Sequence, residues 1–219
     1  MTRSAWGDNT KAVKGKYIAV EGPIGVGKSQ LISALAERLS AQTIKDTDNP
    51  FLPSFYNNME KYAFQVQLFF LMSRFQQQVD CSQPDLFSQY TLCDYLFHKD
   101  RLFASLTLEP QEFALYEKVY GLLKGTAATP DVVIYLQAST DTLIKRIAQK
   151  DEDLALLLPK NYLEKVVHAF QTFFFHFSLC PVIVCNTDKN DFENNPDNID
   201  LLIRKISEVK SGLNYLNLD

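Results

Sequence analysis

The chain has 219 residues, of which 46% are hydrophobic and 22% charged, and its formal net charge at pH 7 is −4. This length suits one α/β domain with a full core, so we expect a single domain at 16–219. It follows a polar, aperiodic segment at 1–15 that we expect to be loose. The negative charge argues against a nucleic-acid-binding protein. No apolar run approaches the roughly 20 residues of a membrane span, so we expect no membrane partner.

The four cysteines form no C-x-x-C pair. No signal peptide is recognised, and Cys93 and Cys185 lie in apolar surroundings. This usage is typical of reduced core residues rather than of a disulfide or zinc framework. We therefore expect a cytoplasmic protein.

The strongest motif is the segment Glu21–Ser29, EGPIGVGKS, which has the spacing G-x-x-x-x-G-K-S. An apolar run, Tyr17–Val20, precedes it, and an amphipathic stretch, Leu31–Ala36, follows it. In such a phosphate loop, backbone N–H groups surround phosphates, the lysine reaches the β and γ phosphates, and the serine hydroxyl holds Mg²⁺. The helix beginning at the lysine adds its positive end. The predicted triphosphate-binding residues are Gly22, Ile24, Gly25, Val26, Gly27, Lys28 and Ser29.

The next elements along the chain are shorter and more polar. The loop helix should end near Ser40, and a short strand is predicted at 42–45, before a loop at 46–53 that contains two prolines. Apolar residues at helical spacing predict one long helix over 60–79. A third strand at 90–95, a helical segment at 96–103 and a helix at 109–124 follow.

The second half alternates strands and helices clearly. A continuous apolar run at 131–137 predicts a strand covered on both faces. A helix to about Lys150, a helix at 162–177, a strand at 181–186 and a closing helix at 196–211 complete the pattern. This alternation predicts an α/β fold with a five-stranded parallel sheet wound by helices on both faces.

Nearly all of residues 16–214 resemble the deoxynucleoside kinases, a family of the P-loop nucleoside and nucleotide kinase group. Beyond the phosphate loop, the resemblance rests on Asn49–Leu52 with Phe55 and Tyr56, Tyr62–Leu71 with Ser73–Phe75, Lys99–Ala104, Pro130–Gln137, Tyr162–Glu164 and Asn186–Asp188. The segment Asp94–Phe97 makes the chain most similar to a bacterial deoxyadenosine/deoxyguanosine kinase-like branch.

The resemblance implies a P-loop kinase fold with a short lid at about 146–160. It implies transfer of the γ-phosphoryl group of ATP, with Mg²⁺, to the 5′-hydroxyl of a deoxynucleoside, in a cytoplasmic homodimer. It also implies that Gln67 hydrogen-bonds the base edge, that Arg74 lies beside the sugar and the catalytic carboxylates, and that Phe64 and Tyr56 line the nucleoside site. The alternatives are a solvated polar residue for Gln67 and a surface salt bridge for Arg74.

The first departure from the family pattern concerns the general base. In the family, this glutamate lies five residues before the asparagine that matches Asn49, and here that position is Ile44. An isoleucine cannot accept a proton. Either Asp46 or Asp48 therefore reaches the site from a shifted loop, or no dedicated base exists. A solvated turn-forming acid is the alternative for Asp46.

Two further departures concern charge around the phosphates. The family arginine after the third strand is missing from Cys93-Asp94-Tyr95, although Asp94 can hold Mg²⁺ directly or through water. A structural carboxylate paired with Arg74 or Arg101 is the alternative role for Asp94. In the lid, Arg146 and Lys150 remain, but the next cation position is Glu152, inside an acidic run at 151–153.

Two hypotheses follow. The first is an active deoxynucleoside kinase in which Lys28, Asp94, Arg146 and Asp46 are catalytic, with Ser29 and Asp94 as Mg²⁺ ligands. The second is a catalytically degraded homologue that binds nucleotide and acts as a regulatory or partner subunit. Retention of Lys28 and Ser29 favours the first, whereas Ile44 and the acidic lid favour the second. A kinase acting on a nucleoside monophosphate is a weaker third reading, because acceptor phosphates usually need additional arginines.

Overall fold

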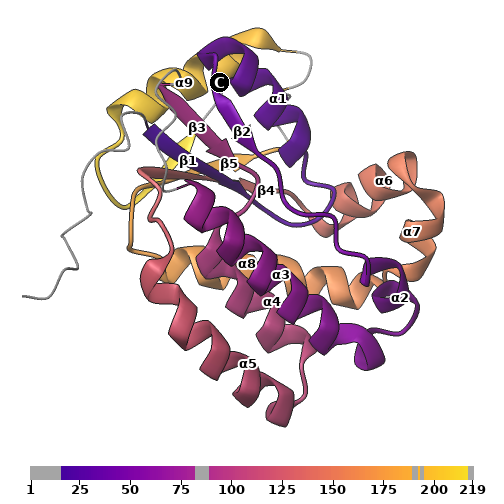
Figure 1. Ribbon diagram of the computed structural model, residues 1–219. Coiled ribbons are helices and arrows are strands. Elements are labelled where there is room, and N and C mark those ends of the chain that lie inside the picture. The colour runs from indigo at the N-terminus through magenta and orange to yellow at the C-terminus, as the bar shows by residue number, and fades with distance from the viewer. Residues whose placement is uncertain (1–15, 82–88, 189–191, 193–194, 217–219) are drawn as a thin grey trace, which may run out of the picture.

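The computed structural model describes residues 16–81, 89–188, 192 and 195–216. The segment at 1–15, expected to be loose, lies outside the described residues. The described strands form one sheet in which every neighbouring pair is parallel. Its order is β2-β3-β1-β4-β5-β6 (Figure 1). The strands are β1 Lys16–Glu21, β2 Gln42–Ile44, β3 Tyr90–Cys93, β4 Val132–Gln137, β5 Val182–Asn186 and β6 Leu213–Leu216.

The α/β fold and its five predicted strands are confirmed, but the strand count is wrong because the sheet has six. The predicted closing helix ends at Glu208, and Gly212, with φ 66°, turns the chain into β6. This edge strand has four residues, and its Tyr215 side chain is exposed. Because β6 is short and half-polar, no apolar run reveals it in the sequence.

Helices cover both faces of the sheet (Figure 1). They are α1 Lys28–Leu39, α2 Leu52–Asn57, α3 Met59–Cys81, α4 Asp100–Thr107, α5 Pro110–Leu123, α6 Thr140–Lys150, α7 Glu152–Leu157, α8 Lys160–His176 and α9 Pro196–Glu208, with short 3₁₀ turns η1 Phe97–Lys99 and η2 Lys124–Thr126. These elements match the predicted helices closely, and α2 and α7 are additions within segments predicted as loop and lid.

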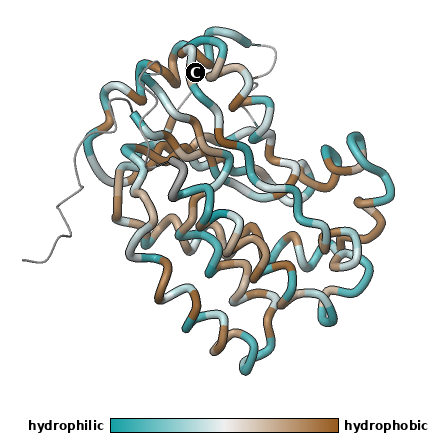
Figure 2. The backbone as a smooth tube through the Cα atoms, in the orientation of Figure 1, coloured by the Kyte–Doolittle hydropathy of each residue, from teal (hydrophilic) through white to brown (hydrophobic). Residues whose placement is uncertain are grey.

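The alternation of side chains along the central strands explains the two covered faces. Ile18 and Ile134 belong to the core that α1, α6 and α9 cover, whereas Ala19 and Tyr135 belong to the core that α8 covers. Successive strand residues point to opposite faces, so a strand buried on both must be apolar throughout. Figure 2 shows hydrophobic residues gathered where the helices meet the sheet.

The remaining global expectations concern cysteines and membranes. Cys93 and Cys185 are buried and form no disulfide, and the side chain of Cys81 lies outside the description. Within the described ranges, no helix combines the length and the apolar character needed to span a bilayer. The predicted lid at 146–160 corresponds to the end of α6, all of α7 and the turn before α8; its movement stays a prediction.

Candidate active site

The phosphate loop connects β1 to α1 at the carboxyl edge of the sheet. Gly22 and Gly25 have φ values of 155° and 79°. A Cβ atom at Gly22 would lie 2.5 Å from the carbonyl oxygen of Leu136, and one at Gly25 would lie 2.7 Å from a side-chain carbon of Ile147. Both positions therefore require glycine, because the backbone conformation and the neighbouring atoms exclude a side chain.

Lys28 begins α1 and folds back over the loop. Its Nζ atom donates a hydrogen bond to the carbonyl oxygen of Gly22, with a length of 2.8 Å. Burial lowers the pKa of Lys28, and the neighbouring Glu21 carboxylate opposes that shift. Ser29 lies beside it in the first turn of α1 and is exposed. The loop thus presents an ammonium, a hydroxyl and a helix N-terminus together, as a triphosphate–metal site requires.

A pocket of about 1030 Å³ opens next to the loop. We call it the donor pocket; it is lined by residues 24–30, 136, 146, 147, 149–151, 154, 187, 188 and 192. Arg146 forms part of its wall and donates to the Thr187 carbonyl at 2.7 Å, to the Thr187 hydroxyl at 2.8 Å and to the Val26 carbonyl at 3.3 Å. The structure therefore brings Arg146 to the donor side and anchors it to the loop. Its catalytic role stays a prediction.

The acidic run of the lid begins α7. The Asp151 side chain caps this helix by accepting a hydrogen bond from the Leu154 backbone N–H at 2.9 Å, and Glu152 and Asp153 occupy the first turn. Carboxylates at this end of a helix are favoured by its dipole. All three acids are exposed, and Asp151 also lines the donor pocket. The three acids therefore suit the N-terminus of α7.

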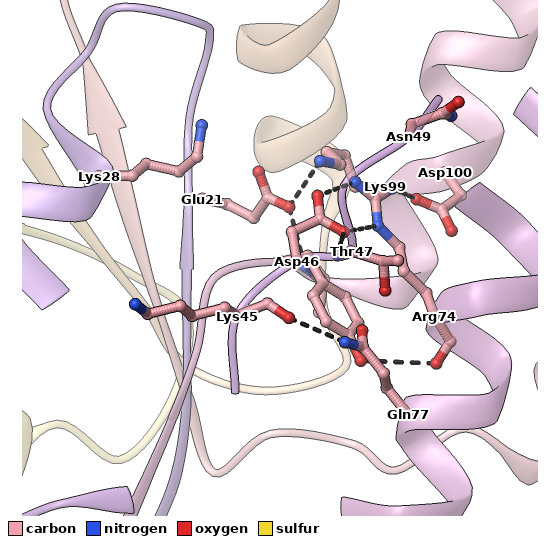
Figure 3. A network of polar contacts seen from close by, with 12 residues as sticks. Glu21, Lys28, Lys45, Asp46, Thr47, Asn49, Arg74, Gln77, Lys99 and Asp100 are labelled. Atoms are coloured by element: carbon pink, nitrogen blue, oxygen red, sulfur yellow. Dashed lines mark hydrogen bonds and ion pairs between the residues drawn. The ribbon is translucent and has the colours of Figure 1, made fainter. Parts of the chain in front are cut away.

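Asp46 lies beside Arg74, as Figure 3 shows. The Arg74 Nε atom donates to Asp46 Oδ1 at 2.9 Å, and its two terminal nitrogens pair with Asp46 Oδ2 and Asp100 Oδ1. Arg74 is buried and stacks on the Phe70 ring, with 4.4 Å from its Cζ atom to the ring centroid. Asp46 is therefore not a solvated loop acid, and Arg74 is not part of a surface salt bridge. Asp48 is exposed.

The buried charges shift one another's titration. Burial alone would raise the pKa of Asp46, but the charge and hydrogen bonds of Arg74 hold it below its ordinary value. Burial raises the pKa of Asp100 to about 6, against the opposing effect of Arg74. Asp46 is therefore ionised at neutral pH and can accept a proton.

Asp94 follows β3, and its backbone N–H donates to the Ile44 carbonyl at 3.0 Å. Burial raises the pKa of Asp94, and the positive charge of Lys28 partly offsets this increase. In the described part of the chain, its buried Oδ1 atom has no hydrogen-bond partner. Asp94 is paired with neither Arg74 nor Arg101; the latter pairs with Glu117 at 2.7 Å.

An orphaned carboxylate oxygen close to the phosphate loop fits Mg²⁺, which prefers oxygen ligands. The described residues contain no group of three or more histidine, cysteine or acidic side chains that could hold a metal. Ser29 and Asp94 would therefore hold the ion together with phosphate oxygens and water.

Ile44 and Tyr95 pack in one small core cluster. Ile44 lies at the end of β2 and packs against Tyr17, Cys93 and Tyr95. Tyr95 is fully buried, and its hydroxyl donates to the Arg74 carbonyl at 3.4 Å.

Sequence reasoning missed the ion pair between Glu21 and Lys99, whose Oε1 and Nζ atoms are 2.8 Å apart (Figure 3). Both side chains are buried. The available signal was Glu21 itself, an acid at the end of a fully buried strand. A buried carboxylate needs a hydrogen-bonding or charged partner. Lys99, directly before Asp100 in the chain, is the residue that fills this role.

The predicted nucleoside-binding residues lie on α2 and α3. Gln67 lies on α3, and 6% of its surface is exposed. Tyr56 on α2 and Phe64 on α3 are half-buried, and burial raises the pKa of Tyr56. Asn49 anchors the loop before α2, because its amide donates to the Val66 carbonyl at 3.1 Å.

Comparison with known proteins gives a consistent result. The pattern of the deoxynucleoside kinase family matches residues 18–211. A deoxyguanosine kinase of Bacillus subtilis is 30% identical over 200 residues, covering 88% of this chain and 97% of the relative. A deoxyadenosine/deoxycytidine kinase of the same organism is 27% identical, with 90% and 94% covered.

Solved structures show the same fold. The deoxyadenosine kinase from M. mycoides with bound dATP superimposes with a TM-score of 0.75 at 22% identity, covering 88% of this chain and 100% of that one. The structure of that enzyme with bound dCTP gives a TM-score of 0.74. These relatives support the first hypothesis, an active kinase, and not the degraded homologue. The chain belongs to the deoxynucleoside kinase family.

Proposed function

We propose that this protein transfers the γ-phosphoryl group of ATP to the 5′-hydroxyl of a deoxynucleoside, with a purine as the expected base. The observation that carries the proposal is that Asp46, ionised and hydrogen-bonded by Arg74, is close enough to Lys28 of the phosphate loop to interact with it electrostatically. The proposed base and the phosphate-binding cation thus interact electrostatically. The purine preference is supported by relatives named for deoxyguanosine and deoxyadenosine.

The chemical step needs positioning and charge neutralisation more than covalent chemistry. Asp46 accepts the 5′-hydroxyl proton as the new bond from O5′ to the γ-phosphorus forms and the bond to the β-phosphate oxygen breaks. Lys28 and the loop N–H groups neutralise the charge on the departing ADP. Arg74 holds the Asp46 carboxylate in its orientation through two hydrogen bonds.

Ser29 and Asp94 are the proposed Mg²⁺ ligands. When bound there, the ion would supply charge neutralisation at the phosphates. The raised pKa of Asp94 supports this role, because a buried carboxylate without a hydrogen-bond partner gains most from a nearby cation. Arg146 and Lys150 lie on the donor pocket wall, where cations face the triphosphate.

Gln67 is proposed to hydrogen-bond the edge of the base, and Tyr56 and Phe64 are proposed to line the nucleoside site. Its support is the place of Gln67 on α3, where it is largely buried, since an amide offers both a donor and an acceptor to a base.

A homodimer is the proposed assembly. Met72 on α3 and Leu115 and Leu122 on α5 are exposed apolar side chains, and exposed apolar patches often mark interfaces. A cytoplasmic location stays the expectation from cysteine usage.

The test is to incubate the purified chain with ATP, Mg²⁺ and each of the four common deoxynucleosides, and to separate the products by chromatography. We expect a 5′-monophosphate and ADP in equal amounts, with the highest rate for a purine. The matched Lys28→Ala variant should form neither. Absence of monophosphate with every acceptor would refute the proposed function.

A further inference from the structure

The Glu21–Lys99 pair sits between the donor and acceptor sides of the site. Glu21 Oε2 accepts a hydrogen bond from the Gly22 N–H at 3.0 Å, at the start of the phosphate loop. Its Oε1 atom accepts from the Leu96 N–H at 2.8 Å and from Lys99 Nζ at 2.8 Å. One buried carboxylate therefore joins the phosphate loop, the turn after β3 and η1.

Of the two other cations near this pair, Arg74 is paired with carboxylates and Lys28 is not. Arg74 is taken by two carboxylates, Asp46 and Asp100. Lys28, in contrast, is bonded to the neutral carbonyl of Gly22, although Glu21 is bonded to the N–H of that same residue. Glu21 would be the natural partner of Lys28 if Lys99 did not already neutralise it, because two opposite buried charges attract strongly.

We propose that Lys99 is a positioning residue that neutralises Glu21 and thereby keeps the ammonium of Lys28 available for the phosphates of the donor. This inference rests on the proposed function, since it assigns Lys28 to a triphosphate. Lys99 does not touch the nucleotide itself: its side chain is 6% exposed, and its Nζ atom lies 5.1 Å from the centroid of the Phe103 ring. It acts through the carboxylate of Glu21.

Lys99→Met tests the proposal. Without Lys99, Glu21 draws Lys28 into an ion pair, so the variant should stay folded and bind ATP about tenfold more weakly or worse. Adding Glu21→Gln removes the competing carboxylate, and the double variant should recover ATP affinity to within about threefold of wild type. Binding of ATP with Mg²⁺ is measured by titration calorimetry, and folding by circular dichroism.

The control is a second ion pair remote from the site. Arg38 and Asp200 pair at 3.2 Å on the exposed surface between α1 and α9. Arg38→Met and the double variant with Asp200→Asn should both bind ATP as wild type does. If Lys99→Met does not fold, Lys99→Gln takes its place, because it keeps a neutral hydrogen bond to Glu21.

The outcomes separate the possibilities. Wild-type ATP affinity in folded Lys99→Met would overturn the proposal, since Lys28 would then bind the phosphates even when Lys99 does not neutralise Glu21. Weak ATP binding that Glu21→Gln fails to rescue would also overturn it, because Lys99 would then contact the phosphates directly. Failure of the wild-type chain itself to bind ATP would instead count against the proposed function.

Discussion

At the scale of single residues, the site depends on one carboxylate whose position the family pattern does not give. Asp46 lies two residues after Ile44, the position that corresponds to the family base, and its hydrogen bonds to Arg74 place it in the charge cluster. The sequence could offer Asp46 and Asp48 as candidates but could not choose between them. That choice depends on the path of the loop after β2 and on an arginine 28 residues further along the chain.

The Asp46–Arg74 pair makes stability depend on pH. Because the folded pKa of Asp46 is lowered, its contribution is present above the ordinary carboxylate pKa of 3.8 and is lost as the pH falls through the folded value. Asp46→Asn should therefore lower the free energy of unfolding by about 1–3 kcal/mol at pH 7. The deficit should be smaller at pH 3, which lies below that ordinary value. Urea denaturation of both proteins at the two pH values measures it.

Asp48→Asn is the matched control for this experiment, since Asp48 is an exposed acid of the same loop. It should leave stability unchanged at both pH values. An equal deficit for Asp46→Asn at pH 7 and pH 3 would show that charge does not cause the effect.

At the scale of elements, β2 shows why a family residue was replaced without loss of the fold. Ile44 packs into a small core with Tyr17, Cys93 and Tyr95. Its side chain therefore stabilises the packing of the sheet and does not contact the deoxynucleoside. A carboxylate there would be partly buried among these side chains.

Ile44→Glu should therefore destabilise the protein by about 2–4 kcal/mol and give no increase in kcat. This expectation reverses what the family pattern alone suggests, namely that restoring the glutamate restores a base. Ile44→Val is the control and should cost about 0.5–1.5 kcal/mol. Thermal unfolding and steady-state kinetics measure both effects, and a stable Ile44→Glu protein with a higher kcat would contradict this reading of β2.

Helix α7 illustrates a conflict between local stability and catalysis. Its first turn carries Glu152, an acid that the helix N-terminus favours, at a position where the family resemblance leads us to expect a cation. Glu152→Arg should raise kcat severalfold while costing about 0.3–1 kcal/mol of stability, because it removes a favourable helix-dipole contact.

The control for the lid is Glu164→Arg, which makes the same charge change at an exposed position of α8. It should leave kcat unchanged. If both variants raise kcat equally, the effect would come from overall charge and not from the lid.

At the scale of the whole molecule, the sequence predicted what local patterns determine. Apolar runs located β1, β4 and β5, and the glycine spacing located the phosphate loop, because each depends on a few consecutive residues. It could not predict β6, the Glu21–Lys99 pair or the orphaned oxygen of Asp94. These depend on contacts between segments far apart in the chain, which no periodicity records.

The sheet order brings those segments together. Strand β1 lies between β3 and β4, so the carboxyl ends of β1, β2 and β3 deliver Glu21, Asp46 and Asp94 to one edge. Ligands of open parallel sheets bind at that edge. The central claim is that Asp46, delivered in this way, takes the place of the missing family base.

Single-turnover phosphate transfer tests that claim most directly. Wild type and Asp46→Asn are each mixed with saturating ATP, Mg²⁺ and the best deoxynucleoside, and the monophosphate formed is followed by rapid quench. We predict that Asp46→Asn lowers the transfer rate by about 10²–10⁴-fold while ATP affinity stays within about threefold of wild type. Transfer by a folded Asp46→Asn protein at the wild-type rate would contradict the account.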